Sequence, residues 1–525
     1  MTIRLTLILI SIGLSSGWFM SGTKVQDGTP PSDISSIDCE KSCFYYEKNA
    51  TFSCSNRTCD AFPNEMPETT KVAILEVNNI KEIRSLSCGY LKVLDLSTNK
   101  IELIEPGVFR RCSNLTHIDL SLNSINTTLT GTTFEILTPP DISLQHLDLS
   151  FNKIVQLPGE IFQHLTRSLE FLDLSNNRIK VFDVQSFRDL YRLKRLILSS
   201  NGIGRIDPKQ FKGLYALIEL VMNDNHITTV FDNTFTDLDH LEVLDLGFND
   251  ITAVETDAFV GLENLEKLVL SHNQITTLDP KLFDPLVSLT DLHLDFNPIM
   301  NIYPRTFPLG LVYLTMVNSD LEEIPSKAFA NLLDLDIVHL SFNKRLHTIA
   351  ADAFGGKTSP VRELSIKNNS LTKISHDLLN WERVTNVDMG GNNWACDCDM
   401  KWIKEQPIPN RNLREMRCAS PQWLVNKRID NIPEHLFTCE EGKISNKMAF
   451  RTGMVAVTTF AFFFALFAFL YKCRTKVMPC WFAKPGKYFA LYNAKDMDDA
   501  SVTTNGFAGQ GVVKHRNGAP APVHV

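Results

Sequence analysis

The chain has 525 residues, of which 44% are hydrophobic and 21% charged, and its formal net charge is −8. This length suits several ordinary domains or one long array of repeats. Residues 472–525 carry +5, so residues 1–471 carry −13 (−8 − 5). That acidic balance gives no reason to expect a protein that binds nucleic acid.

Residues 1–22 have the layout of a secretory signal peptide. Arg4 precedes an apolar run over residues 5–14, and small residues follow it. A membrane-spanning helix needs about 20 apolar residues, so this run is too short to be an anchor. We expect secretion, with cleavage between Gly17 and Thr23.

Eight of the 12 cysteines fall in two groups of four, and residues 113–395 between these groups contain no cysteine. The groups are Cys39, Cys43, Cys54 and Cys59, and Cys396, Cys398, Cys418 and Cys439. Such clusters are typical of small modules held by disulfides in an oxidising compartment. We expect one cysteine-rich cap over residues 39–71 and another over residues 395–439.

An internal repeat fills residues 72–394. LKVLDLSTNKI from Leu91, LQHLDLSFNKI from Leu144 and LEVLDLGFNDI from Leu241 share the pattern L-x-x-L-x-L-x-x-N-x-I, and most copies are 24 residues apart. This is a leucine-rich repeat, with about 13–14 copies if an irregular one near Val72 is included. Stacked copies predict an α/β solenoid, a horseshoe whose concave side is a curved parallel β-sheet.

Two other positions of the repeat are expected in the core. An Asn follows each strand where the chain bends, because a carboxamide can both donate to and accept from buried backbone groups. A Phe occurs 18 residues after the first Leu and predicts an aromatic spine on the convex side. The asparagines are Asn99, Asn123, Asn152, Asn177, Asn201, Asn225, Asn249, Asn273 and Asn297, and the phenylalanines are Phe109, Phe162, Phe187, Phe211, Phe235, Phe259, Phe283, Phe307 and Phe329.

Two further pairs of cysteines have more than one interpretation. Cys88 and Cys112 are one repeat apart, so they are either a disulfide between stacked repeats or two small buried hydrophobic residues. Cys396 and Cys398 could belong to a metal site. Zinc ligands occur as C-x₂₋₄-C pairs, and the later cysteines of that cap form no such pair, so we favour disulfides there.

Residues 39–439 resemble the extracellular leucine-rich-repeat family with cysteine-rich N- and C-terminal flanks. Toll-type ectodomains, slit-type modules and adhesion receptors of the capricious/tartan type belong to it. The stretch NNWACDCDMKWI, followed by Cys418 and Cys439, matches the C-terminal flank of the family. The resemblance implies the disulfides Cys396–Cys418 and Cys398–Cys439.

The N-terminal flank departs from the family pattern. Tyr45 stands where the third cysteine is usual, and Cys59 is extra. Pairing Cys39–Cys59 with Cys43–Cys54 is one of the three connectivities that four cysteines allow.

Beyond the second cap, residues 440–451 form a short juxtamembrane segment. Residues 452–471, TGMVAVTTFAFFFALFAFLY, are uncharged and long enough to span a bilayer. With the signal peptide they predict one transmembrane helix, with the N-terminus outside the cell. Residues 472–525 would then be a disordered cytoplasmic tail.

Three short features of the tail are candidates for regulation. Cys473 and Cys480 lie beside the predicted helix, where cysteines are either S-acylated or left as free thiols. Tyr488 and Leu491 fit a Tyr-x-x-apolar endocytic signal. Val523 and Val525 suit strand addition to a PDZ groove.

Five N-x-S/T sequons predict glycosylation and therefore a solvated surface. They are Asn49, Asn56, Asn114, Asn126 and Asn368. Repeats between residues 144 and 335 contain none of them, which leaves this part of the array open to a ligand.

The outward strand positions are stereotyped in many copies, often with Asp, but several later copies differ. Side chains at alternate positions of a strand point to one side, so we expect a ligand-binding patch on the concave face. Its residues are Lys267, Val269, Asp291, His293, Asp295, Tyr313 and His339. A metal or acid–base site at Asp291, His293 and Asp295 is a weaker alternative, because the pattern supplies no nucleophile or closed pocket. Drift on a solvated face is the other alternative.

Together these features predict a non-enzymatic, single-pass receptor of the plasma membrane without a cofactor. It would bind an extracellular protein, or a like chain on another cell, and its tail would recruit PDZ or endocytic adaptors. The alternative is an innate-immune pattern-recognition receptor or co-receptor that lacks a signalling domain of its own.

Overall fold

The computed structural model describes residues 43–439 except 64–65, 87, 127–128, 136–143, 406–407, 409–412 and 414. The chain divides into two compact units, Met1–Cys439 and Glu440–Val525. Within the described part, no helix combines the length and the apolar character needed to cross a bilayer. Several predictions lie outside it: the signal peptide 1–22, Cys39, the juxtamembrane segment 440–451, the transmembrane helix 452–471, and the tail 472–525 with Cys473, Cys480, Tyr488, Leu491, Val523 and Val525.

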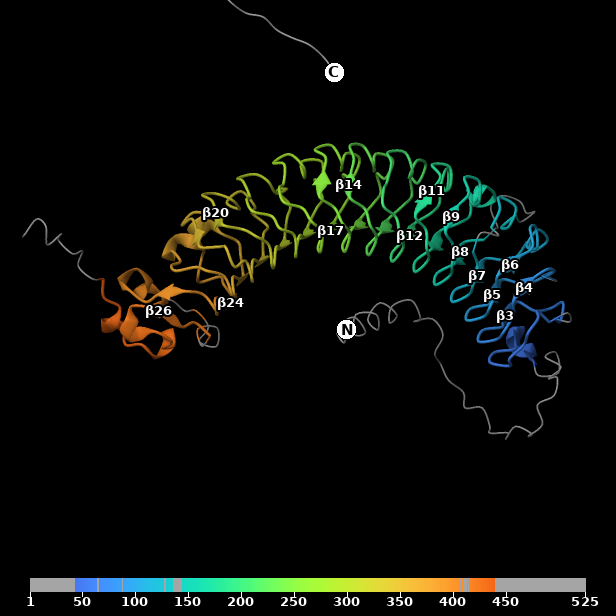
Figure 1. The fold of residues 1–525 in the computed structure, drawn as a ribbon, viewed down its shortest axis with the longest axis horizontal. Helices are drawn as coiled ribbons and strands as arrows, with labels where there is room; N and C mark the ends of the chain where they lie inside the picture. The colour runs from blue at the N-terminus through green and yellow to red at the C-terminus, as the bar shows by residue number, and fades with distance from the viewer. Residues whose placement is uncertain are drawn as a thin grey trace, which may run out of the picture. The chain divides into compact units, whose positions relative to one another are not determined.

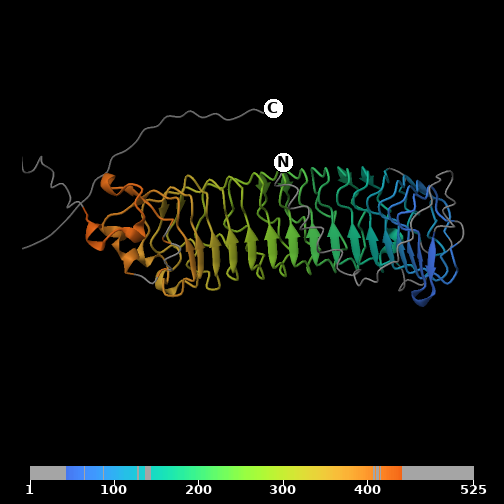
Figure 2. The same cartoon turned by 90° about the horizontal axis from the view of Figure 1, so that it is seen from below.

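The described residues form an arc whose concave side is one 16-stranded sheet (Figures 1 and 2). The strands β1 (Phe44–Tyr46) and β2 (Thr51–Ser53) form an antiparallel hairpin at the N-terminal end. The other fourteen strands are parallel and in register. They are β3 (Val72–Ile74), β5 (Val93–Asp95), β7 (His117–Asp119), β8 (His146–Asp148), β10 (Phe171–Asp173), β12 (Arg195–Ile197), β13 (Glu219–Val221), β15 (Val243–Asp245), β17 (Lys267–Val269), β18 (Asp291–His293), β19 (Tyr313–Thr315), β21 (Ile337–His339), β23 (Glu363–Ser365) and β24 (Asn386–Asp388).

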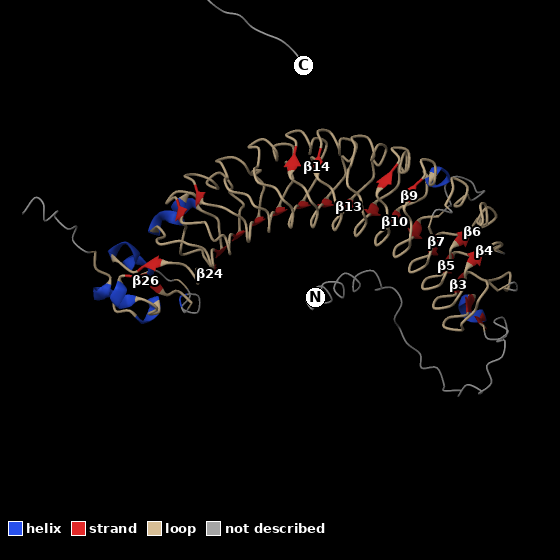
Figure 3. Ribbon diagram, in the orientation of Figure 1, coloured by secondary structure: helices blue, strands red, loops and turns tan. Residues whose placement is uncertain are grey.

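The convex side corrects one expectation. An α/β class requires α-helical return segments, and the described return segments are not α-helices. The described segments are turns, two-residue strands and short 3-10 helices (Figure 3). The convex strands are β4 (Glu82–Ile83), β6 (Leu103–Ile104), β9 (Gln156–Leu157), β11 (Val181–Phe182), β14 (Thr229–Val230), β16 (Ala253–Val254), β20 (Glu323–Ile324) and β22 (Thr348–Ile349), and the 3-10 helices there are η3 (Gln163–Leu165), η4 (Gly356–Thr358) and η5 (His376–Leu378). A 24-residue repeat spends about half its length on the strand and its bend, so the return is too short for an α-helix of ordinary length.

The buried asparagines connect each repeat to the one before it. Asn249 Nδ2 lies 3.1 Å from each of three carbonyl oxygens, those of Met222, Leu246 and Gly247, and its Oδ1 accepts from the N–H of Ile227 at 3.0 Å. The same pattern recurs along the array and extends beyond the predicted set to Asn78, Asn343, Asn369 and Asn392. Each carboxamide therefore satisfies backbone groups that a buried bend would leave unpaired.

One repeat breaks this ladder. Ser319 occupies the Asn position of the repeat that begins at Leu311, and only its backbone N–H takes part, donating to Asn343 Oδ1 at 2.7 Å. Its hydroxyl is buried and has no hydrogen-bond partner among the described residues. This repeat is the place where the bend is least well satisfied.

The core is completed by the predicted spine of phenylalanines. Successive rings stack with centroids 4.8–6.4 Å apart from Phe109 to Phe354, with Phe182 inserted between Phe187 and Phe211. The structure adds Phe134 and Phe354 to the predicted set. All of these side chains belong to one continuous hydrophobic core.

Disulfides close both ends of the arc. The structure contains Cys43–Cys54 and Cys88–Cys112 near the N-terminal end, the latter joining neighbouring repeats with Cα atoms 5.0 Å apart. Cys59 is also disulfide-bonded. Its expected partner, Cys39, is outside the described residues, so that pairing stays a prediction.

The C-terminal cap contains Cys396–Cys418 and Cys398–Cys439, the two pairs that the family resemblance implies. Cys398, Cys439 and Asp399 lie close enough together to hold a metal ion, but the disulfide occupies both sulfur atoms. The cap consists of β25 (Trp394–Ala395), β26 (Cys418–Ser420) and the 3-10 helices η6 (Cys398–Lys404), η7 (Gln422–Leu424), η8 (Ile429–Asn431) and η9 (Glu434–Leu436). Another short 3-10 helix, η2 (Glu47–Asn49), lies at the other end of the described residues.

The Asn ladder makes a direct prediction about stability. Asn249→Ala should lower the free energy of unfolding by at least about 2 kcal/mol, because it leaves buried backbone groups without partners. Ser319→Ala should change it by less than about 0.5 kcal/mol or raise it, because the hydroxyl it removes is already unpaired. Urea denaturation followed by tryptophan fluorescence measures both, and an equal loss in the two variants would contradict the role assigned to the carboxamide.

Candidate functional site

The concave patch, defined as Lys267, Val269, Asp291, His293, Asp295, Tyr313 and His339, is assembled by four adjacent strands. The register of β17, β18, β19 and β21 pairs Lys267 with Asp291 and Asp291 with Tyr313, and it pairs Val269 with His293. These side chains therefore form two parallel rows across the sheet. The central residues of the same strands point into the core and are buried.

Three rings of the concave patch touch one another. The Tyr313 ring lies between His293, at a centroid distance of 5.2 Å, and His339, at 5.6 Å and edge-on. Tyr313 Oη is 3.4 Å from His339 Nδ1, and the other ring nitrogen of His339 is 3.1 Å from Glu363 Oε1. This ring cluster is half-buried and presents both apolar faces and polar edges, as residues at protein interfaces commonly do.

The surroundings of two rings of the cluster favour their uncharged forms. Burial is the main cause that lowers the pKa of His293, and Lys267 lowers it further, against the opposing effect of Asp295 and Asp291. Burial also raises the pKa of Tyr313, helped by Asp295 and Glu363. His293 and Tyr313 therefore offer hydrogen-bonding rings beside the charged side chains of the patch.

Asp295 has a structural role as well as a place in the patch. Its Oδ1 accepts hydrogen bonds from the hydroxyl of Thr315 and from the N–H of Val317, the latter at 2.7 Å. The carboxylate therefore holds the next turn of the solenoid. Asp291 is partly engaged too, because its Oδ2 accepts from Thr290 Oγ1 at 2.6 Å. This arrangement supports neither a metal site nor an acid–base pair at Asp291, His293 and Asp295.

Sequence reasoning missed the C-terminal neighbours of the patch. A hollow of about 320 Å³ adjoins His339 and is lined by Glu363, Asp388 and Glu415, with Ser365, Asn386 and Val387. Lys367 Nζ lies 3.4 Å from Asp388 Oδ2 and 2.6 Å from Glu415 Oε2. The register pairs Glu363 with Ile337 and Ser365 with His339, so Glu363 contacts His339 diagonally across the two strands and equivalent repeat positions do not predict this contact.

A second set of concave residues was also missed, near the N-terminal end. His146 stacks on Phe171 with centroids 4.0 Å apart, and His117 follows at 5.4 Å. Beside them runs a row of four aspartates, Asp95, Asp119, Asp148 and Asp173. Each accepts a hydrogen bond from the backbone N–H two residues later.

The pKa values of the four aspartates in this row are raised, with burial as the largest cause. Burial, followed by the charge of Asp173, raises the pKa of Asp148 to about 6. Burial, with help from His117, lowers the pKa of His146 to about 4. Stacked repeats bring like groups into adjacent positions, and each charge then disfavours its neighbour.

The predicted glycosylation sites differ in exposure. Asn49 and Asn56 are exposed, whereas Asn114 and Asn368 are only partly so. Asn114 Nδ2 donates to the carbonyl of Gly89 at 2.8 Å. Asn126 is partly exposed, and its sequon continues into residues outside the described range. Glycosylation at all five positions stays a prediction.

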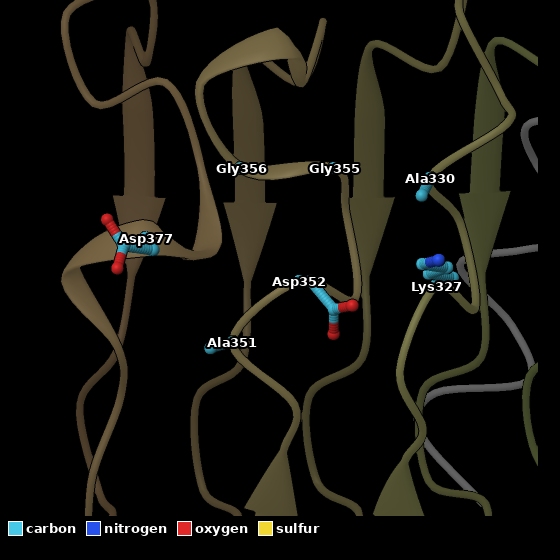
Figure 4. Close-up of a pocket in the computed structure, with 7 residues that line it drawn as sticks. All are labelled: Lys327, Ala330, Ala351, Asp352, Gly355, Gly356 and Asp377. Atoms are coloured by element: carbon cyan, nitrogen blue, oxygen red, sulfur yellow. The ribbon is translucent and has the colours of Figure 1, made fainter.

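Another hollow, of about 480 Å³, lies on the convex side (Figure 4). It is lined by Lys327, Ala330, Ala351, Asp352, Gly355, Gly356 and Asp377. These residues come from return segments of successive repeats and include no Ser, Cys or His that could serve as a nucleophile. The hollow therefore gives no support to a catalytic site.

Two family models match the chain over its repeats. The model described as "Leucine rich repeat" matches residues 89–137, 142–203, 191–251 and 239–299, and the model "BspA type Leucine rich repeat region (6 copies)" matches residues 300–393. Together they cover more than half of the 525 residues. The chain is a leucine-rich-repeat protein.

Curated relatives match parts of this leucine-rich-repeat protein. They include leucine-rich repeat-containing protein 3 of Danio rerio (29% identical; 27% of this chain and 44% of the relative), keratocan of Bos taurus (28%; 34% and 51%) and Toll-like receptor 7 of Mus musculus (41%; 17% and 8%). The chain thus spans about half or less of these relatives. Among solved structures, Toll in the Drosophila Toll–Spätzle complex has a TM-score of 0.55 at 19% identity, over 71% of this chain and 55% of Toll, which shows a common fold.

The aspartate row predicts how stability depends on pH. A carboxyl whose folded pKa is raised stabilises the fold below its unfolded pKa and loses that contribution as pH rises towards 6. Asp148→Ser removes this loss. The unfolding midpoint of the variant minus that of wild type should therefore increase as the pH is raised from 4 to 7. The expected gain is about 1.4 kcal/mol for each unit by which the folded pKa exceeds the unfolded one.

Thermal unfolding of both proteins at pH 4, 5, 6 and 7 tests this expectation. Ser365 occupies the equivalent position of β23, so serine is compatible with the strand. The His146 ring, whose lowered pKa acts in the opposite direction, is present in both proteins and cancels in the difference. A variant that tracks wild type at every pH would show that Asp148 is not under strain.

Proposed function

We propose that this chain is a recognition or adhesion receptor that binds a protein ligand through the concave patch. The observation that carries the proposal is the half-buried His293–Tyr313–His339 ring cluster on a rigid sheet. Tyr and His rings bury much area at a small cost in conformational entropy, which makes them effective anchors for a protein partner. The disulfide caps suit an extracellular site of action.

The topology in this proposal rests on sequence. Residues 1–22 would direct secretion, residues 452–471 would anchor the chain in the plasma membrane, and residues 472–525 would sort it or recruit adaptors through Tyr488–Leu491 and Val523–Val525. No enzymatic step is assigned. The solenoid would meet its ligand on the extracellular side, and its second cap would end only 12 residues before the predicted membrane helix.

A second candidate function is an innate-immune receptor or co-receptor that lacks its own signalling domain. Two likenesses support this candidate: the similarity to Toll-like receptor 7 over 88 residues and the fold shared with Toll. In this case the concave patch would present a ligand to a signalling partner rather than to a neighbouring cell.

The concave patch can be tested by substitution on the cell surface. Replacing His293, Tyr313 and His339 together by Ala should abolish proximity labelling of ligand proteins, because all three rings of the cluster are lost. Surface expression should not change, because their side chains lie outside the core. The matched control is Tyr191→Ala with Tyr215→Ala, a stacked and exposed tyrosine pair away from the concave strands. An unchanged set of labelled proteins in the triple variant would place the binding site elsewhere.

Cell aggregation separates the two functions. Cells that express the chain should cluster with one another if it is an adhesion receptor, and the triple variant should disperse them at equal surface density. A co-receptor predicts no clustering unless a partner is supplied. Clustering that survives the triple variant would mean that adhesion does not use the concave patch.

A further inference from the structure

A row of exposed or partly exposed side chains borders the concave sheet at the position just before the ladder asparagines. We call it the edge row; it contains Leu122, Phe151, Phe248, His272, Phe296 and Phe342. Every one of these residues has a positive φ, between 52° and 63°. The conformation continues the backbone ladder, since the N–H of Phe248 donates to Ser271 O at 2.8 Å and that of His272 to Asp295 O at 2.7 Å.

Bulky side chains are unfavourable in this left-handed conformation, whereas Asn tolerates it well. The same row contains Asn176, Asn318 and Asn368 with φ of 55°. The fold is therefore satisfied by asparagine at this position and does not require phenylalanine. Aromatic residues kept in a strained conformation and exposed to solvent point to a function.

Three members of the edge row form a continuous aromatic stack. The His272 ring is 4.0 Å from the Phe248 ring and 4.1 Å from the Phe296 ring, with interplanar angles of 11° and 12°. Phe248 is 50% exposed and Phe296 is 45% exposed. Because the rings lie face to face, the stack presents ring edges, and only the outer faces of Phe248 and Phe296 point away from His272. It adjoins strands β15, β17 and β18, which carry part of the concave patch.

The repeats around the stack are strongly acidic. Residues 217–300 contain 16 Asp and Glu but only two basic residues, Lys267 and Lys281, for a net charge of −14. The rest of the chain therefore carries +6 (−8 + 14). A field of this sign attracts cationic segments and repels acidic ones.

Two carboxylates come from positions next to Phe248 in the repeat. Asp224 precedes Phe248 in the edge row and accepts a hydrogen bond from Ser200 Oγ at 2.9 Å. Asp250 follows Phe248 by two residues, and its oxygens lie 3.1 Å from His226 Nδ1 and 3.2 Å from Gln274 Nε2. These partners fix the carboxylates in place next to the stack. No sequon falls within residues 217–300, so no predicted glycan covers this surface.

We propose that the Phe248–His272–Phe296 stack binds a basic segment of a protein partner in which Arg or Lys alternates with apolar residues. The apolar side chains cover the rings. The cationic groups lie over the exposed ring faces and within reach of Asp224 and Asp250. This inference rests on the proposed function and names the class of its partner, since the stack adjoins the concave patch and a single extended ligand can contact both.

The test uses the purified full-length chain and three synthetic 12-residue peptides as probes. One alternates Arg and Leu, one alternates Glu and Leu, and one alternates Arg and Ser. The Arg–Leu peptide should bind at least ten-fold more tightly than either of the others, and raising NaCl from 50 to 500 mM should weaken its binding. Equal binding of the Glu–Leu peptide would overturn the proposal.

Asparagine substitutions give matched variants that the fold already accepts. Phe248→Asn with Phe296→Asn should weaken binding of the Arg–Leu peptide at least ten-fold. Phe151→Asn is the control, because Phe151 has the same φ of 53° and is 43% exposed but lies outside the acidic repeats; it should leave the affinity unchanged. An equal loss in the control, or no loss in the double variant, would contradict the role of the stack.

Two further outcomes are separated by the same variants. If the double variant instead abolishes self-association measured by sedimentation, the occupant is a second copy of this chain and the proposal of a foreign basic partner is wrong. The concave triple variant distinguishes this inference from the proposed function. If the concave triple variant loses its ligand on the cell surface and the Phe248/Phe296 variant keeps it, the inference about the stack is wrong. The proposed function would still stand.

Discussion

The buried carboxamide of each ladder asparagine is the interaction on which the rest of the structure depends. A repeat of about 24 residues must turn sharply after its strand, and the turn leaves backbone N–H and carbonyl groups inside the core, where an unpaired group costs about 1–3 kcal/mol. Asn225 and Asn249 satisfy such groups in their own repeat and in the preceding one. The side chain therefore sets both the bend and the spacing between repeats.

Because the spacing is regular, residues at equivalent positions come into contact whether or not they are compatible. Equivalent positions hold Asp148 and Asp173 side by side, and the charge of Asp173 adds to burial, the larger cause, in raising the pKa of Asp148. Equivalent positions also place Phe248 against His272. The neighbouring aspartates repel one another, which is a cost. The Phe248–His272 stack gains ring contacts but exposes the rings to solvent. Function in such a solenoid is therefore read along rows of equivalent residues rather than within any one repeat.

Much of this architecture could be predicted from the sequence because it depends on short-range pattern. The Leu alternation predicted the concave strands, and the Phe period predicted the spine up to Phe329. The α/β class was wrong, although the 24-residue spacing in the sequence already limited the length of the return segment. Contacts such as Tyr313 with His339 depend on side-chain rotamers across a repeat, which spacing alone does not determine. The edge row was overlooked, because the backbone φ that makes Phe248 unusual is invisible in the sequence.

The edge row and the concave patch together explain why the acidic repeats of residues 217–300 are informative. On a solvated face without a function, the left-handed position would be expected to hold residues that tolerate it, as Asn176 and Asn318 do. Phe248 and Phe296 occupy it instead, on either side of His272, and the charge around them is of one sign. Conformational cost, exposure and charge therefore coincide in the same repeats. A ligand that covers Val269 and His293 on β17 and β18 reaches the edge row without leaving these repeats, so one extended binding surface accounts for both features.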